Sequence, residues 1–155
     1  MNTFRHENRT VITHGPEETE ALGAALAREI APGSVVALYG NLGAGKTVFA
    51  RGFARGLAVT ETVSSPTYTI VQEYPLSDGS GGYFYHLDLY RIADERAALG
   101  FGVDEFLNDP GSYALLEWPE RIAGILPPDL IRVTIRRTDD ETREIELKFP
   151  EVTEK

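Results

Sequence analysis

The sequence contains no cysteine, which excludes disulfide bonds, zinc sites built on thiolates and thiol nucleophiles. It also lacks any apolar run near the ~20 residues of a membrane span, and its polar start has no signal-peptide core. We therefore expect a cytoplasmic protein that makes no membrane contact. The 155 residues, 42% of them hydrophobic, fit one domain over residues 1–155, with a loose tail at 150–155.

Basic residues are scarce, because 15 Lys and Arg stand against 24 Asp and Glu, for a net charge of −9. A domain that binds nucleic acid by itself usually carries a basic patch. Here the longest basic run is the pair Arg136-Arg137. If RNA is involved in the function, we expect another chain to hold it, and an acidic surface also suits docking to a basic partner.

Hydrophobic periodicity and turn residues divide the chain into alternating helices and strands. This alternation favours an α/β sheet with helices on its faces, and the predicted hairpins make the sheet mixed. The expected helices are Glu17–Ile30, about Lys46–Gly56, and Asp94–Leu107 with a break at Gly100–Gly102. The expected strands are Ser34–Tyr39, Tyr68–Tyr74, Tyr83–Tyr90, Tyr113–Leu116 closing on Glu117, Ile131–Arg136 and Arg143–Phe149.

A glycine-rich segment joins the strand that ends at Tyr39 to the next helix. It reads Gly40-Asn41-Leu42-Gly43-Ala44-Gly45-Lys46-Thr47 and matches G-x-x-x-x-G-K-[ST], the phosphate-binding loop. Glycine permits backbone angles that surround an oxyanion with N–H groups, and the helix that follows points its positive end at the phosphates. We expect Lys46 to bind the β- and γ-phosphates and the Thr47 hydroxyl to bind Mg²⁺.

Further polar residues are candidates for the remaining chemistry. Strand alternation places His86 and Asp88 on one face. Asp88 contacts the magnesium sphere or the attacking water; alternatively, His86 and Asp88 form a buried hydrogen-bonded pair or belong to an exposed strand face. Glu117 closes an apolar strand, where nucleotide hydrolases commonly present an acid to Mg²⁺; the alternative is an ordinary exposed acid. Trp118 either stacks on a base or belongs to the core or to an interface. Thr67 either senses the γ-phosphate or belongs to a proline turn.

The nucleotide is expected to be ATP, because the guanine-reading motif Asn-Lys-x-Asp is absent. From the residues alone, three classes stay open: an ATP hydrolase, a small-molecule kinase, and a module in which nucleotide only shapes a docking surface. Kinases of this size usually carry an arginine-rich lid. The one tight arginine pair here lies in a predicted strand, which disfavours that class.

Four segments, in their order and spacing, make the chain similar to the TsaE family, the bacterial ATPases of tRNA threonylcarbamoyladenosine synthesis. They are Gly40–Thr47, Ser65–Thr69, His86–Arg91 and Leu116–Glu120. The resemblance extends over almost the whole chain, from about Thr13 to Phe149. It implies a three-layer fold like that of P-loop NTPases, with a mixed β-sheet, helices on its faces and a C-terminal hairpin.

The resemblance also implies a function: an ATP hydrolase, weak alone and stimulated by partners, that is required for the modified adenosine at position 37 of tRNAs reading ANN codons. A TsaD-type transferase with a TsaB-type companion would transfer the group, and tRNA would meet this chain only through that complex. By match to the family motifs, Lys46 would bind phosphate, Thr47 and Glu117 would bind magnesium, and Asp88 would be needed for hydrolysis. The other implied nucleotide contacts are Gly15, Asn41, Leu42, Gly43, Ala44, Gly45, Glu120 and Arg143.

Overall fold

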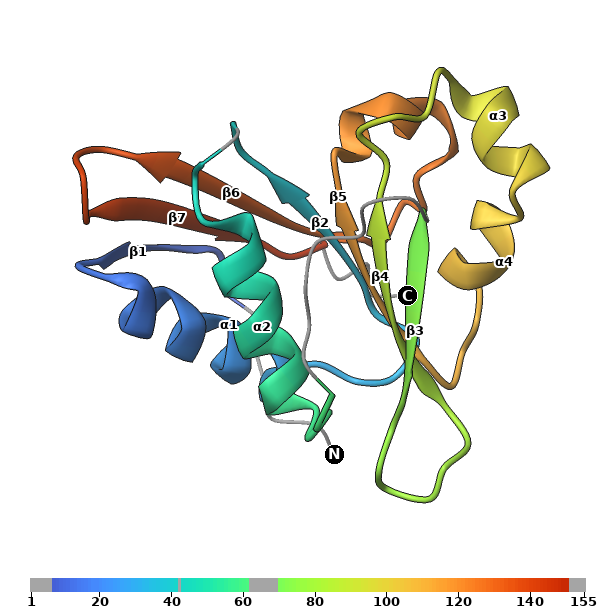
Figure 1. Cartoon of the computed structure of the whole chain (residues 1–155), viewed down its shortest axis with the longest axis horizontal. Helices are drawn as coiled ribbons and strands as arrows, with labels where there is room; N and C mark the ends of the chain where they lie inside the picture. The colour runs from blue at the N-terminus through green and yellow to red at the C-terminus, as the bar shows by residue number, and fades with distance from the viewer. Residues whose placement is uncertain (1–6, 42, 62–69, 151–155) are drawn as a thin grey trace, which may run out of the picture.

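The computed structural model describes residues 7–41, 43–61 and 70–150, and its seven strands form one sheet in the order β1-β7-β6-β2-β5-β4-β3 (Figure 1). The strands are β1 (Arg9–Thr13), β2 (Val35–Tyr39), β3 (Val71–Pro75), β4 (Tyr83–Asp88), β5 (Tyr113–Glu117), β6 (Ile131–Arg137) and β7 (Arg143–Lys148). β6, β2, β5 and β4 run parallel, whereas β1, β7 and β3 pair antiparallel. The expected mixed sheet is confirmed.

Helices cover both faces of this sheet, so the fold has three layers (Figure 1). The helices are α1 (Pro16–Glu29), α2 (Lys46–Gly56), α3 (Glu95–Gly100), α4 (Val103–Leu107) and the 3₁₀ helix η1 (Pro119–Ile125). Successive side chains of a strand point to opposite faces. In β5, Leu115 accordingly joins the core beneath α1 and α2, while Leu116 joins the core beneath α3, α4 and η1.

α1 and α2 pack against each other at very short range. A Cβ added to Gly52 would lie 1.8 Å from the Glu20 carbonyl oxygen, and one added to Gly23 would lie 2.3 Å from that of Phe49. Phe49 and Phe53 of α2 are fully buried, as the helical spacing predicts. The glycines therefore let α1 hold α2, and with it the glycine-rich loop, firmly against the sheet.

Most element boundaries lie within a residue or two of the sequence-based expectations, but two elements were not expected and β4 is shorter than expected. β1 was not expected, because one side of it stays exposed, and the strand is specified by its antiparallel pairing with β7. β4 ends at Asp88 rather than at Tyr90, since the Tyr90 N–H turns back to donate to Asp88 Oδ1 at 3.0 Å. The second unexpected element is η1, for which no helix was predicted. The break near Gly102, whose φ is +77°, is confirmed between α3 and α4.

Some expectations fall on residues outside the described ranges: Leu42, Thr67, the first two positions of the strand expected at Tyr68, and most of the tail. No helix in the described part of the chain is both long and apolar enough to span a bilayer.

Candidate nucleotide-binding site

The glycine-rich loop connects β2, at the centre of the sheet, to the start of α2. Gly40, Gly43 and Gly45 have φ values of +156°, +80° and +109°, which L side chains rarely adopt. A Cβ on Gly40 would also lie 2.8 Å from the Ile135 carbonyl oxygen. The N-cap of α2 is Gly45, which makes no side-chain cap. The N–H groups in the first turn of a helix have no carbonyl partner within the helix, and such a turn suits an anion.

Lys46, the first residue of α2, is buried, with only 6% of its surface exposed. Among the residues that the structure describes, its Nζ finds no hydrogen-bond partner, and it lies 3.9 Å from the centre of the Trp118 ring. Burial lowers the pKa of Lys46, while Glu117, Glu120 and Asp88 act to raise it. A buried ammonium group without a hydrogen bond is costly, so this position favours an anionic ligand.

Asp88 and Glu117 lie side by side at the ends of adjacent parallel strands, as their register in β4 and β5 shows. Burial raises the pKa of Asp88, and the charge of Glu117 raises it further; the Tyr90 N–H, His86 and Lys46 lower it. The structure therefore brings Lys46, Asp88 and Glu117 into one electrostatic cluster. Thr47 follows Lys46 in α2 and is half-buried.

The alternative in which His86 forms a buried pair with Asp88 is wrong. His86 Nε2 lies 2.6 Å from Glu117 Oε2, so the buried hydrogen-bonded pair is His86 with Glu117 rather than with Asp88. The alternative of an exposed acid at Glu117 is also wrong, because only 4% of this residue is exposed. Both side chains point to the same face of neighbouring strands, which the order of strands in the sheet decides.

The other implied contacts fall on two sides of the loop. Gly15 and Arg143 line a pocket of about 240 Å³ beside Gly45. Glu120 instead lies in η1, on the side of Lys46, where it influences the pKa of that lysine. Sequence reasoning missed the remaining lining residues of the pocket, since they come from three separate segments and form no local pattern: Pro16, Thr19, Val48, Asp140 and Glu141.

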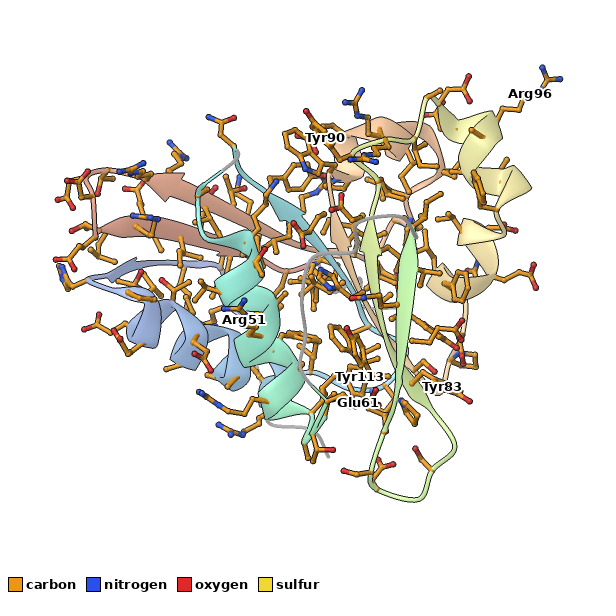
Figure 2. All side chains as sticks on the ribbon, in the orientation of Figure 1. Arg51, Glu61, Tyr83, Tyr90, Arg96 and Tyr113 are labelled. Carbon is orange, nitrogen blue, oxygen red and sulfur yellow. The ribbon has the colours of Figure 1, made fainter. Side chains whose placement is uncertain are left out.

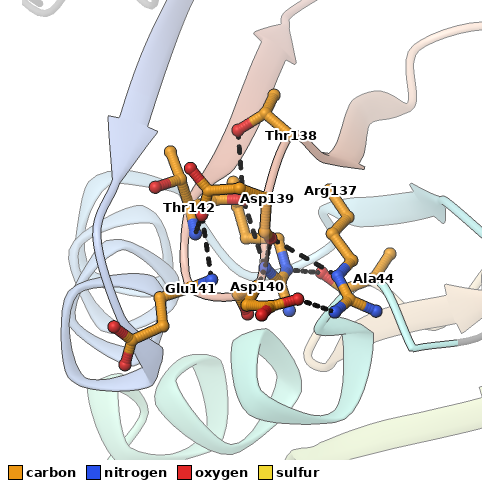
Figure 3. A network of polar contacts seen from close by, with 8 residues as sticks. Ala44, Arg137, Thr138, Asp139, Asp140, Glu141 and Thr142 are labelled. Carbon is orange, nitrogen blue, oxygen red and sulfur yellow. Dashed lines mark hydrogen bonds and ion pairs between the residues drawn. The ribbon is translucent and has the colours of Figure 1, made fainter.

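The hairpin between β6 and β7 lies beside Ala44 of the glycine-rich loop (Figure 3), and Arg143 connects the two. Its Nε donates to the Ala44 carbonyl oxygen at 2.7 Å, and its Nη1 donates to the carbonyl oxygens of Asp139, Asp140 and Thr142 at 3.1–3.3 Å. Arg137 also pairs with Asp140 at 2.8 Å. The guanidinium group of Arg143 thus stabilises the backbone that faces the pocket.

Trp118 and Tyr90 extend the cluster to the surface. Their ring centres are 5.0 Å apart, and Tyr90 is 44% exposed on the connection that leaves β4 (Figure 2). Trp118 has a φ of +60°, unusual for a residue with a side chain, which places its ring against Lys46. A path of aromatic contacts therefore connects Lys46 to exposed Tyr90.

The loop between a central parallel strand and a helix, together with the buried lysine in that helix, defines a nucleotide-binding protein of the P-loop class. Comparison with known proteins then identifies its family. The family model "Threonylcarbamoyl adenosine biosynthesis protein TsaE" matches residues 13–145. The chain belongs to the TsaE family.

Individual relatives agree with this assignment. The tRNA threonylcarbamoyladenosine biosynthesis protein TsaE of Bacillus subtilis is 44% identical over 133 residues, which cover 86% of this chain and 80% of that protein. The protein of the same name from Treponema pallidum is 34% identical, over 86% of this chain and 96% of the relative. The crystal structure of Bacillus subtilis YdiB superimposes with a TM-score of 0.70 at 36% identity, covering 92% of this chain and 87% of that one. The expected P-loop NTPase-like fold class is confirmed.

Proposed function

We propose that this protein is an ATPase required for the threonylcarbamoyladenosine modification at position 37 of tRNAs that read ANN codons. Membership of the TsaE family supports the pathway. The observation that carries the ATPase activity is the buried Lys46, whose Nζ has no hydrogen-bond partner within the described ranges and lies in one electrostatic cluster with Asp88 and Glu117.

The two sides of the loop suit the two ends of ATP. The pocket of about 240 Å³ between Gly15, Gly45 and Arg143 would take the adenosine end. The N–H groups of Asn41, Leu42, Gly43, Ala44 and Gly45 and the start of α2 would bind the phosphates. Lys46 would neutralise the β- and γ-phosphates, and Glu120 would contact the nucleotide from η1.

The donor groups beside Lys46 fit a magnesium ion, because Mg²⁺ prefers hydroxyl and carboxylate oxygens. The Thr47 hydroxyl and the Glu117 carboxylate would hold it. When bound, Mg²⁺ neutralises charge on the phosphate oxygens. Asp88 would orient the attacking water and accept its proton; burial raises the pKa of Asp88, which makes it a stronger base than an exposed aspartate.

Hydrolysis would serve a larger complex rather than a reaction of this chain alone. The proposed partners are a TsaD-type transferase and its TsaB-type companion in the cytoplasm, with tRNA reached through that complex. The net charge of −9 supports this arrangement, since an acidic chain is poorly suited to gripping tRNA by itself.

The test is ATP hydrolysis by the purified chain alone and with both partners plus tRNA. We expect slow hydrolysis alone and faster hydrolysis in the complex. Asp88→Ala is expected to bind ATP and yet lose hydrolysis and the modification; full partner function in this variant would instead indicate a non-catalytic module. Normal modification of ANN-reading tRNAs in a depleted strain would refute the pathway, and transfer of labelled γ-phosphate to a metabolite would indicate a kinase.

A further inference from the structure

His86 is a fully buried residue of β4 to which the proposed chemistry assigns no role. Its ring stacks on Phe84, with centres 6.1 Å apart and planes 9° apart. Its Nε2 lies 2.6 Å from Glu117 Oε2, and both side chains are almost completely shielded from water. The imidazole ring therefore contacts the carboxylate proposed to bind magnesium, from the side of the core.

The chemistry of the pair settles which atom donates. A carboxylate that binds magnesium is ionised and only accepts hydrogen bonds, so in the proposed site His86 Nε2–H donates a hydrogen bond to Glu117 Oε2. The other ring nitrogen, Nδ1, is buried with no hydrogen-bond partner in the described part of the chain. An unpaired buried nitrogen is unfavourable, whereas a phenylalanine ring would stack on Phe84 at no such cost. Packing alone therefore does not account for histidine at this position.

We propose that His86 is a positioning residue for the magnesium site: it fixes Glu117 by the Oε2 atom and so orients the carboxylate that receives the ion. This role rests on the proposed function of Glu117. Partners that hydrogen-bond to metal-binding groups fix their orientation, and loss of such a partner typically weakens metal affinity or activity by ~10- to 100-fold. Asp88 does not need this support, since the Tyr90 N–H already holds its Oδ1 at 3.0 Å.

A matched pair of substitutions separates the hydrogen bond from the volume of the ring. In His86→Gln the side-chain amide nitrogen reaches about as far from the backbone as Nε2, whereas in His86→Asn it reaches only as far as Nδ1. His86→Phe keeps a ring on Phe84 without a donor. Tyr85→Phe is the control, because it removes the Tyr85 hydroxyl bond to Asp109 on the opposite face of the same strand.

The measurement is calorimetric ADP binding as a function of Mg²⁺ concentration, with a parallel series in EDTA and thermal unfolding of each variant. We expect His86→Asn and His86→Phe to need ~10- to 100-fold more Mg²⁺, with little change in metal-free binding. His86→Gln should keep most of the Mg²⁺ affinity, and Tyr85→Phe should keep all of it. Reduced thermal stability alone, at parental Mg²⁺ affinity, is what a merely structural role would produce.

Two results would overturn the role of His86 and leave the proposed function standing. One is parental Mg²⁺ affinity in folded His86→Phe. The other is an equal loss of affinity in His86→Gln and His86→Asn, which decides the question even if the phenylalanine variant does not fold. Nucleotide binding by the parent protein that is indifferent to Mg²⁺ would instead overturn the proposed metal site and this role together.

Discussion

Replacing Lys46 by methionine is expected to change stability and ligand binding in opposite directions. The Nζ of Lys46 is buried without a hydrogen-bond partner among the described residues, and burial lowers its pKa. A lowered pKa means that the charged form of Lys46 is less favourable in the folded protein than in the unfolded chain. The charge therefore reduces the stability of the fold at neutral pH. That cost is fully present below the folded pKa and disappears as the pH rises from the folded pKa to the ordinary value of 10.5. Methionine removes the charge and still packs on the Trp118 ring.

The two effects have different magnitudes. A buried unpaired polar group costs ~1–3 kcal/mol, and the contact of the ammonium with Trp118 returns ~0.5–2 kcal/mol. The net gain in stability from Lys46→Met is therefore about 1 kcal/mol without ligand, which raises Tm by ~2–4 °C in a chain of this size. Losing the charge beside the phosphates costs ~2–4 kcal/mol of binding, or roughly 30- to 1000-fold in affinity.

Thermal unfolding with and without MgATP measures both effects. With ATP at 100 times its Kd, the parent gains about 2.7 kcal/mol, or ~5–11 °C. A variant with 100-fold weaker binding gains only ~0.4 kcal/mol, below ~2 °C. If Lys46→Met were less stable than the parent without ATP, the reasoning about the unpaired ammonium would be refuted. A shift with ATP as large as that of the parent would remove Lys46 from the site.

Further predictions concern packing, charge and the aromatic contact. Gly52→Ala should lose ~1–3 kcal/mol in urea unfolding, since its Cβ would overlap the Glu20 carbonyl at 1.8 Å, whereas Gly100→Ala, with open space around it, should not. Asp88→Asn should be more stable than the parent at neutral pH: burial raises the folded pKa of Asp88, so the parent loses stability as the pH rises through that value. The difference in stability between Asp88→Asn and the parent should vanish as the pH falls toward 3.8, the ordinary pKa of aspartate. A difference that stays constant with pH would show that burial of the charged carboxylate is not its cause. The fluorescence of Trp118, the one tryptophan in the sequence, should change when MgATP binds and the Lys46 ammonium moves from the Trp118 ring to the phosphates. In Lys46→Met, the fluorescence should not change on addition of MgATP.

The sequence by itself determined the features that depend on neighbours along the chain. The loop Gly40–Thr47, the strand before it and the helix after it follow from local glycine, charge and periodicity patterns. The alternation in β4 places His86 on one face of that strand. The apolar run before Glu117 likewise predicts that Glu117 ends a strand. Each of these features depends on the hydrophobic periodicity of one segment, so that segment alone is enough to predict it.

Only the tertiary structure decided which of these groups meet. His86 binds Glu117 because β4 lies beside β5, and Arg143 reaches the Ala44 carbonyl 99 positions away because β6 pairs with both β2 and β7. Lys46 contacts the Trp118 ring, and Trp118, the N-cap of η1, has a left-handed backbone conformation. The periodicity of a segment specifies which face is buried, but the partner across that face depends on strand order and register. Those are set by packing of the whole sheet rather than by any one stretch of sequence.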